Sequence, residues 1–237
     1  MRVLRLVLGV LLWVLVLMVS SIPVMTEGGK ALMAKASWLS SGATTQVMMV
    51  GASFVLIAAL SRGRLSRYGF KMATAAKIKA AFIFGSIAAV VVQVALAVVW
   101  QVLPPSTGHP ALAGASFLKI VITVWILASI CEEVLHRGLI QSFLEPLRGY
   151  GTAVFGIRLS LPVIVAAVLF GAVHLMLLTT GADGYLVGGI VGCATVLGLV
   201  AGYYREKTGS LVPAILVHMV FNAYGGASQY LQGLLTR

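Results

Sequence analysis

The sequence predicts an all-α integral membrane protein, a bundle of seven or eight transmembrane helices. Of its 237 residues, 60% are hydrophobic and 10% are charged, and the mean hydropathy is +1.04. Several continuous apolar runs reach about twenty residues, the length that an α-helix needs to cross the hydrocarbon core of a bilayer. The strands of a transmembrane barrel would instead alternate in polarity over about ten residues. A helical bundle is therefore the predicted fold class.

Seven apolar runs are long enough to be spans, and we expect each of them to form a helix. The runs are 4–24, 44–60, 80–102, 117–143, 162–178, 185–204 and 210–230. The first run begins with basic residues, as a signal peptide does, but no small-x-small cleavage pattern follows it. We expect it to remain as the first span.

The placement of basic residues predicts the orientation of the bundle. In a soluble protein a net charge of +11 could indicate a nucleic-acid partner, but here most of the basic residues lie outside the predicted spans. With a cytoplasmic N-terminus, twelve of them face the cytoplasm and four face the other side. The twelve are Arg2, Arg5, Arg62, Arg64, Arg67, Lys71, Lys77, Lys79, Arg148, Arg158, Arg205 and Lys207, and the four are Lys30, Lys35, Lys119 and Arg237. This distribution obeys the positive-inside rule, and we expect no nucleic-acid partner.

Two connecting segments have the pattern of helices that lie on the membrane surface. Residues 28–42 and 62–79 each interleave basic with apolar side chains, as interfacial helices do. The second segment is expected to attract anionic lipid head groups, with an ordinary solvated basic loop as the alternative. No internal repeat or soluble domain is present, so we expect a single structural unit.

Ionisable residues inside one of the apolar runs point to a functional site. The chain has only six acidic residues, yet Glu132 and Glu133 are adjacent within the run 117–143, followed by Arg137. A charge near the centre of a bilayer costs roughly 2.5 to 3.5 kcal/mol on insertion scales, so such a cluster requires a partner, a wet cavity or a reaction. Residues four apart share a helix face, which predicts a Glu133–Arg137 pair and leaves Glu132 on another face.

Other spans bring polar residues to the same depth. From the helical rise, Glu132 and His174 lie roughly 18 Å from the cytoplasmic ends of their spans, and His218 and Asn222 roughly 12 to 18 Å. Charged groups at this depth are tolerated only where protein or water surrounds them. The sequence therefore predicts a polar cavity inside the bundle, open to the cytoplasm.

These residues resemble the ordered motifs of a known family. The motifs are Glu132-Glu133-x-x-x-Arg137, Phe170-x-x-x-His174, Tyr203-Tyr204-x-x-x-Thr208-Gly209-Ser210 and His218-x-x-x-Asn222. In order and spacing they are similar to those of the CAAX protease and bacteriocin-processing family of intramembrane proteases, which includes the type II CAAX prenyl proteases. The resemblance divides the chain into N-terminal spans and interfacial segments, 1–116, a catalytic core, 117–224, and the end of the last helix, 225–237.

The resemblance implies an intramembrane endopeptidase and a role for each motif residue. Glu132 and His174 would hold and activate a water molecule, and His218 and Asn222 would form the oxyanion site. Glu133 and Arg137 would support them as a structural pair. His136 falls at a variable position of the motif, and both a local bond to Glu132 and participation in the site stay open.

Three alternatives remain open at this point. Glu132, His174 and His218 could ligate a zinc ion with water in the fourth position, although we favour a reaction without a cofactor. A transporter could use buried Glu, Arg and His as a proton relay, but the matched repeats or broken helices of carriers are not evident. An inactive family member could act as a membrane scaffold.

The expected partners are a membrane-anchored protein or peptide as substrate and the lipid bilayer, including anionic lipids. The resemblance implies a multi-pass protein of the plasma membrane in a prokaryote, or of the endoplasmic reticulum in a eukaryote, with its site toward the cytoplasm. Plausible substrates are bacteriocin or signalling precursors in the first case and prenylated proteins in the second.

Overall fold

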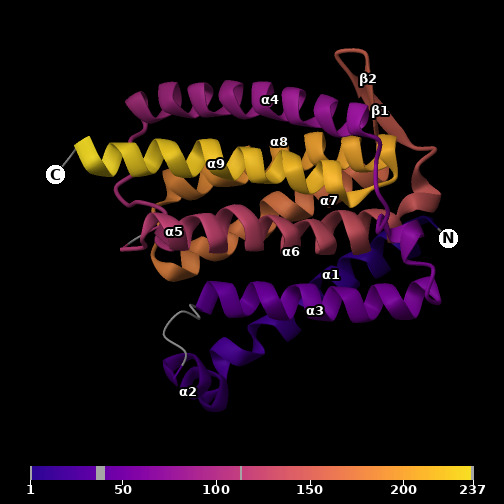
Figure 1. Ribbon diagram of the computed structural model, residues 1–237, viewed down its shortest axis with the longest axis horizontal. Coiled ribbons are helices and arrows are strands. Elements are labelled where there is room, and N and C mark those ends of the chain that lie inside the picture. The colour runs from indigo at the N-terminus through magenta and orange to yellow at the C-terminus, as the bar shows by residue number, and fades with distance from the viewer. Residues whose placement is uncertain (1, 36–40, 113, 236–237) are drawn as a thin grey trace.

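The computed structural model of the chain describes residues 2–35, 41–112 and 114–235. Within these residues the chain is helical almost throughout, with one short β-hairpin. Most of the long helices lie side by side along the long axis of the molecule (Figure 1). The predicted helical fold class is confirmed, with the hairpin as an element that the sequence pattern did not indicate.

The long α-helices follow the predicted apolar runs. They are α1 (Arg2–Met25), α3 (Ser41–Ser61), α4 (Ala75–Val102), α7 (Leu161–Val173), α8 (Gly184–Thr208) and α9 (Leu211–Leu235). Five segments are long and apolar enough to cross a membrane: Arg2–Met25, Gly42–Ser61, Ala75–Val102, Leu161–Thr180 and Gly184–Thr208. In α9 the apolar stretch Leu211–Ala227 is shorter. The chain is thus a multi-pass membrane protein.

The predicted span 117–143 has an irregular helix type. It consists of α5 (Phe117–Ile120), a π-helix (Val121–Ala128), α6 (Ser129–Glu133) and a second π-helix (Val134–Gln141). Hydrogen bonds from residue i to i+5 widen a π-helix, and such turns occur frequently at functional sites. We refer to residues 117–141 as the central helix.

The two predicted interfacial helices are only partly present. In the first segment α2 covers Glu27–Lys35, and residues 36–40 lie outside the described part of the chain. In the second, one 3₁₀ turn (Leu65–Tyr68) precedes an extended stretch that leads into α4. Gly63 and Gly69 have positive φ, which breaks a helix, and Leu65, Tyr68 and Phe70 pack against the core. The expected interfacial helix over 62–79 is therefore wrong.

The two ends of the bundle differ in charge. One end carries the N-terminus, the 62–74 connection, the 142–160 connection and the close of α8, and we call it the basic end (Figure 1). The far end carries α2, the 103–116 connection and the close of α9. All twelve residues assigned to the cytoplasm from the sequence lie at the basic end, so the helices meet the positive-inside rule.

A β-hairpin projects from the basic end. Strand β1 (Gly151–Val154) pairs antiparallel with β2 (Ile157–Ser160). The two turn residues, Phe155 and Gly156, both have positive φ, at 48° and 77°, which matches the type I′ turn that suits a two-residue loop. The hairpin tip is fully exposed.

Two apolar clusters form the core. The first joins α1 and α3 to the second half of the central helix and is centred on Ile57, Leu135, Leu139 and Ile140, all fully buried. The second joins α4, α7, α8 and α9. The central helix lies between them, so a polar side chain on its inner face is enclosed by packed protein.

Close contact between α7 and α8 depends on small residues. A Cβ on Gly198 of α8 would lie 2.8 Å from the Cα of Ala167 on α7 and 3.0 Å from Nη2 of Arg137. One turn further on, a Cβ on Gly202 would lie 3.0 Å from Cγ1 of Val163. The two glycines, four residues apart, therefore permit the close contact between α7 and α8.

Replacing Gly198 tests this packing. We expect Gly198→Ala to lower the thermal unfolding temperature in detergent, because the added methyl meets the backbone of α7, and overpacking of this kind typically costs about 1 to 3 kcal/mol. Gly192→Ala is the matched control on the same helix, since no atom lies within 4 Å of its added methyl. Equal unfolding temperatures for the two variants would contradict the packing argument.

Candidate active site

The central helix places its two adjacent glutamates in different surroundings. Both belong to α6, between the two π-helical stretches. The Glu133 side chain is fully buried, whereas the Glu132 side chain is 14% exposed and lines a cavity. The two carboxylates therefore have separate environments, although they are neighbours in sequence.

Glu133 is held by two basic side chains. Its Oε1 accepts a hydrogen bond from Nη1 of Arg137 at 2.8 Å and another from Nδ1 of His218 at 3.0 Å. Arg137 is also fully buried, and its Cζ lies 4.7 Å from the centre of the Phe170 ring. Within the described residues, Nε and Nη2 of Arg137 have no hydrogen-bond partner, so its charge depends on Glu133 and the aromatic face.

His218 joins the two glutamates. A carboxylate can only accept, so Nδ1 of His218 carries the proton of its bond to Glu133. The other ring nitrogen, Nε2, then faces Oε2 of Glu132 at 3.7 Å. This separation is too long for a direct hydrogen bond and suits a bridging group between them.

His174 contributes its imidazole to the same cavity. Its Nδ1 lies 2.9 Å from the carbonyl oxygen of Phe170, one turn earlier, and a carbonyl can only accept. The proton of a neutral His174 therefore lies on Nδ1 and the lone pair on Nε2. The side chain is half-buried and lines the cavity with Glu132.

The ring of Phe170 is the packing centre of the site. The rings of His136, His174 and His218 meet it edge to face at centroid distances of 4.9, 5.2 and 5.2 Å. Phe170 itself is buried. One aromatic side chain thus sets the spacing of three imidazoles, a role that exceeds the packing of its own helix.

Asn222 ties α9 to the central helix. Its Nδ2 donates to the carbonyl oxygen of Val124 at 3.0 Å and to Oγ of Ser129 at 3.1 Å. The Val124 carbonyl can only accept, which fixes the orientation of the amide. Both amide hydrogens are therefore engaged, and Asn222 also lines the cavity.

His136 has a structural environment. Trp13 of α1 donates from Nε1 to Nε2 of His136 at 3.1 Å, and Nδ1 of His136 lies 2.8 Å from the backbone carbonyl oxygen of Glu132. An indole N–H can only donate, so Nδ1 is the protonated nitrogen. Both ring nitrogens are engaged and the residue is fully buried, which resolves its two sequence-based roles in favour of the local bond.

A cavity of about 560 Å³ collects the four residues predicted to be catalytic, Glu132, His174, His218 and Asn222. Its other walls come from the first part of α3, the last turns of α4 and the 103–116 connection. These segments all belong to the far end of the bundle (Figure 1). The predicted opening to the cytoplasm is therefore not confirmed, because the cavity extends away from the basic end.

Several polar residues of the cavity were not identified from the sequence. Gln46 donates from Nε2 to Oε1 of Glu132 at 2.5 Å, and Gln93 and Lys119 line the walls. The two glutamines could have been identified from the sequence, because each is a polar amide within an apolar run. Ser129, which binds Asn222, could not, because a serine within an apolar run is common.

His109 lies on the connection that borders the cavity. Burial, together with the positive charge of a protonated His174 nearby, lowers the pKa of His109 to about 4. The imidazole is therefore neutral near pH 7. It adds a polar, uncharged group to the far end of the cavity.

Over the described ranges, no group of three or more His, Cys, Asp or Glu side chains is found that could hold a metal ion. The three alternative zinc ligands, Glu132, His174 and His218, line the same cavity. Zinc-dependent hydrolysis therefore stays the alternative to a reaction without a cofactor.

Comparison with known proteins gives a family for most of these elements. Residues 114–224 match the family model described as type II CAAX prenyl endopeptidase Rce1-like. No curated protein and no solved structure matches the chain. The matched segment contains the central helix, α7, α8 and the part of α9 that carries His218 and Asn222. This match agrees with the resemblance found from the motifs and indicates that the protein is a peptidase.

Proposed function

We propose that this peptidase hydrolyses a peptide bond of a membrane-associated protein or peptide with a water molecule activated by Glu132 and His174. One observation carries the proposal: the carboxylate of Glu132 lines the cavity, with its Oε2 3.7 Å from Nε2 of His218, whereas the carboxylate of Glu133 is buried and occupied by Arg137. The lone pair on Nε2 of a neutral His174 in the same cavity gives the water a second acceptor.

The first step needs a base and a polarised carbonyl. Glu132 accepts a proton from the water while the water oxygen bonds to the carbonyl carbon of the substrate, and the carbonyl oxygen becomes an oxyanion. Gln46 holds one carboxylate oxygen of Glu132 and leaves the other, Oε2, toward the water. Glu132 then passes the proton to the amide nitrogen, the C–N bond breaks, and a carboxylic acid and an amine leave.

His218 and Asn222 are the proposed donors to the oxyanion. His218 must be protonated for this role, because its Nδ1 proton is already donated to Glu133. Glu133 then shares one negative charge between His218 and Arg137, so the region keeps a positive charge that favours an oxyanion. Asn222 takes part by exchanging its bond to Ser129 for one to the substrate oxygen.

The proposed substrates are small membrane peptides, such as bacteriocin or signalling precursors, and the C-terminal region of prenylated proteins. The cavity supports both, because it combines the polar layer with apolar walls from α4 and α8 that suit a lipid-embedded chain. Zinc-dependent hydrolysis by the same residues is the alternative mechanism.

We also infer that the substrate enters from the far end of the bundle. The cavity walls include the 103–116 connection, and the positive-inside rule places the opposite, basic end in the cytoplasm. Access from the cytoplasm, which the sequence pattern suggested, would require the opposite orientation of the whole bundle.

Removing the base is the first test. We expect Glu132→Gln to lower peptide cleavage about 10²- to 10⁴-fold, since the amide has a similar shape but cannot accept the proton. The measurement compares membrane peptides by mass spectrometry in cells that express the wild type or the variant. Glu27→Gln, at an exposed position on α2, is the matched control and should leave the products unchanged.

Unchanged products in the Glu132→Gln cells would overturn the mechanism and would favour a transporter or a scaffold instead.

A chelation experiment on the purified wild type separates the two hydrolytic mechanisms. Loss of activity on chelation, with recovery on adding zinc, would make Glu132, His174 and His218 ligands.

The oxyanion role of Asn222 is the second test. With a peptide identified as above, Asn222→Ala should lower kcat about a hundredfold or more, the typical effect of losing one oxyanion donor. Ser129→Ala removes a partner of Asn222 without removing the donor, so its kcat should stay near the wild-type value. If the two variants show the same decrease in kcat and the same decrease in unfolding temperature, Asn222 only connects α9 to the central helix and does not act as an oxyanion donor.

Accessibility tests the orientation. Gly108 in the 103–116 connection and Gly149 at the basic end both have open space around an added side chain. In intact cells we expect a membrane-impermeant maleimide to label Gly108→Cys, and to label Gly149→Cys only after permeabilisation. The wild type gives the background from Cys131 and Cys193. The reverse pattern would place the cavity on the cytoplasmic side.

A further inference from the structure

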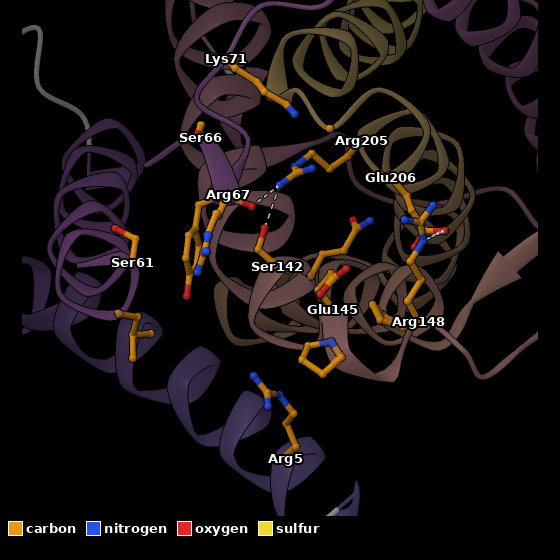
Figure 2. A pocket seen from close by; sticks show the side chains of 16 residues that line it. Arg5, Ser61, Ser66, Arg67, Lys71, Ser142, Glu145, Arg148, Arg205 and Glu206 are labelled. Atoms are coloured by element: carbon orange, nitrogen blue, oxygen red, sulfur yellow. Dashed lines mark hydrogen bonds and ion pairs between the residues drawn. The ribbon is translucent and has the colours of Figure 1, made fainter. Parts of the chain in front are cut away.

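The basic end of the bundle contains a second cavity, separate from the proposed active site. It has a volume of about 510 Å³, and its walls come from α1, the end of α3, the 66–71 stretch, the 141–148 stretch and the end of α8 (Figure 2). We propose that this cavity binds a phosphate group, carried by an anionic lipid head group or by a soluble phosphate compound.

The charge of the cavity walls favours an anion. Five cationic side chains line it, against the two carboxylates of Glu145 and Glu206. The five are Arg5, Arg67, Lys71, Arg148 and Arg205. Glu206 already pairs with Arg148 at 3.2 Å, so an excess of three positive charges remains around the cavity. Guanidinium and ammonium groups that surround one cavity can donate several hydrogen bonds to the oxygens of one phosphate group.

Arg205 gives the strongest sign that a ligand is missing from its surroundings. The residue is only 8% exposed, yet within the described residues no carboxylate lies at ion-pair distance from it. Its Nη2 donates to two neutral acceptors, the carbonyl oxygen of Arg67 at 3.2 Å and Oγ of Ser142 at 2.9 Å. Its Nε has no hydrogen-bond partner in the same set of residues.

A buried guanidinium without a direct ion pair is costly, because neutral acceptors replace only part of its hydration. Figure 2 shows the guanidinium of Arg205 between Lys71, Ser142 and Glu206, on the side that faces the open space. The absence of a side chain at Gly69 makes room for it, since a Cβ there would lie 2.6 Å from Nε of Arg205. A bound phosphate group would supply the missing counter-charge.

The position of the cavity fits a lipid head group. It lies where α3 and α8 end at the basic end, and the long apolar helices continue from there toward the far end (Figure 1). The hydroxyl groups of Ser61 and Ser66 add neutral donors to its walls. Head groups of the cytoplasmic leaflet occupy this level, and basic residues there attract anionic lipids.

Lipid titration tests the site. The purified full chain in dodecylmaltoside is titrated with dioleoylphosphatidylglycerol or dioleoylphosphatidylcholine, and thermal unfolding is followed. We expect the anionic lipid alone to raise the unfolding temperature. The double variant Arg67→Gln with Lys71→Gln should weaken this response about tenfold or more in lipid concentration.

The control has the same change of charge outside the cavity. Lys77→Gln with Lys79→Gln alters the start of α4, and neither residue lines the cavity. This variant should respond to phosphatidylglycerol as the wild type does. Equal weakening in the two double variants would overturn the proposal, because it would indicate attraction to a diffuse basic surface.

Arg205→Gln and inorganic phosphate complete the test. The glutamine keeps a donor for Ser142, and an unchanged unfolding temperature without lipid shows that the variant folds. Its lipid response should fall like that of the cavity double variant, and a wild-type response would contradict the site. Stabilisation by inorganic phosphate that competes with the lipid would assign the site to soluble phosphate compounds, and stabilisation by lipid alone would assign it to head groups.

Discussion

The buried carboxylate of Glu133 is the interaction on which the site depends. It accepts from Arg137 on its own helix and from His218 on α9, and all three side chains are almost completely removed from solvent. Breaking a buried pair of this kind typically costs about 3 to 5 kcal/mol, because the remaining charge has no partner. The rotation of the central helix against α9 is therefore restricted. That restriction is what leaves Glu132, one residue earlier, free to face the cavity.

The polar layer is stable because packed protein encloses it. Apolar clusters lie on both sides of the central helix, and Phe170 belongs to one of them while contacting Arg137 and three imidazoles. Gly198 lets α8 approach the guanidinium of Arg137. Apolar packing thus sets the distances between the helices of the site, and the charged side chains determine which helix faces contact one another. Neither cluster alone would hold the residues of the site, because these come from helices that belong to both.

Local periodicity predicted the parts of the structure that depend on residues close in sequence. The apolar runs predicted the long helices, and the spacing of Glu133 and Arg137 predicted their ion pair. The π-helical turns and the hairpin at Phe155 were not predicted, because helix width and strand pairing leave no clear mark on hydropathy. The bond from Gln46 to Glu132 joins residues 86 positions apart, and no spacing rule reaches that far. Counts of basic residues predicted which end of the bundle faces the cytoplasm, but they carry no information about the end at which the cavity lies.

The hydrogen bond from Trp13 to His136 makes the first helix part of the proposed active site. Trp13 lies a hundred residues before the segment that matches the peptidase family, yet it satisfies a fully buried imidazole next to the proposed base. A fragment that began at residue 114 would keep every family motif and would still have a buried acceptor without its donor. The segment that matches the family model is therefore not autonomous, and minimal versions of this enzyme have to retain the amino-terminal helix α1.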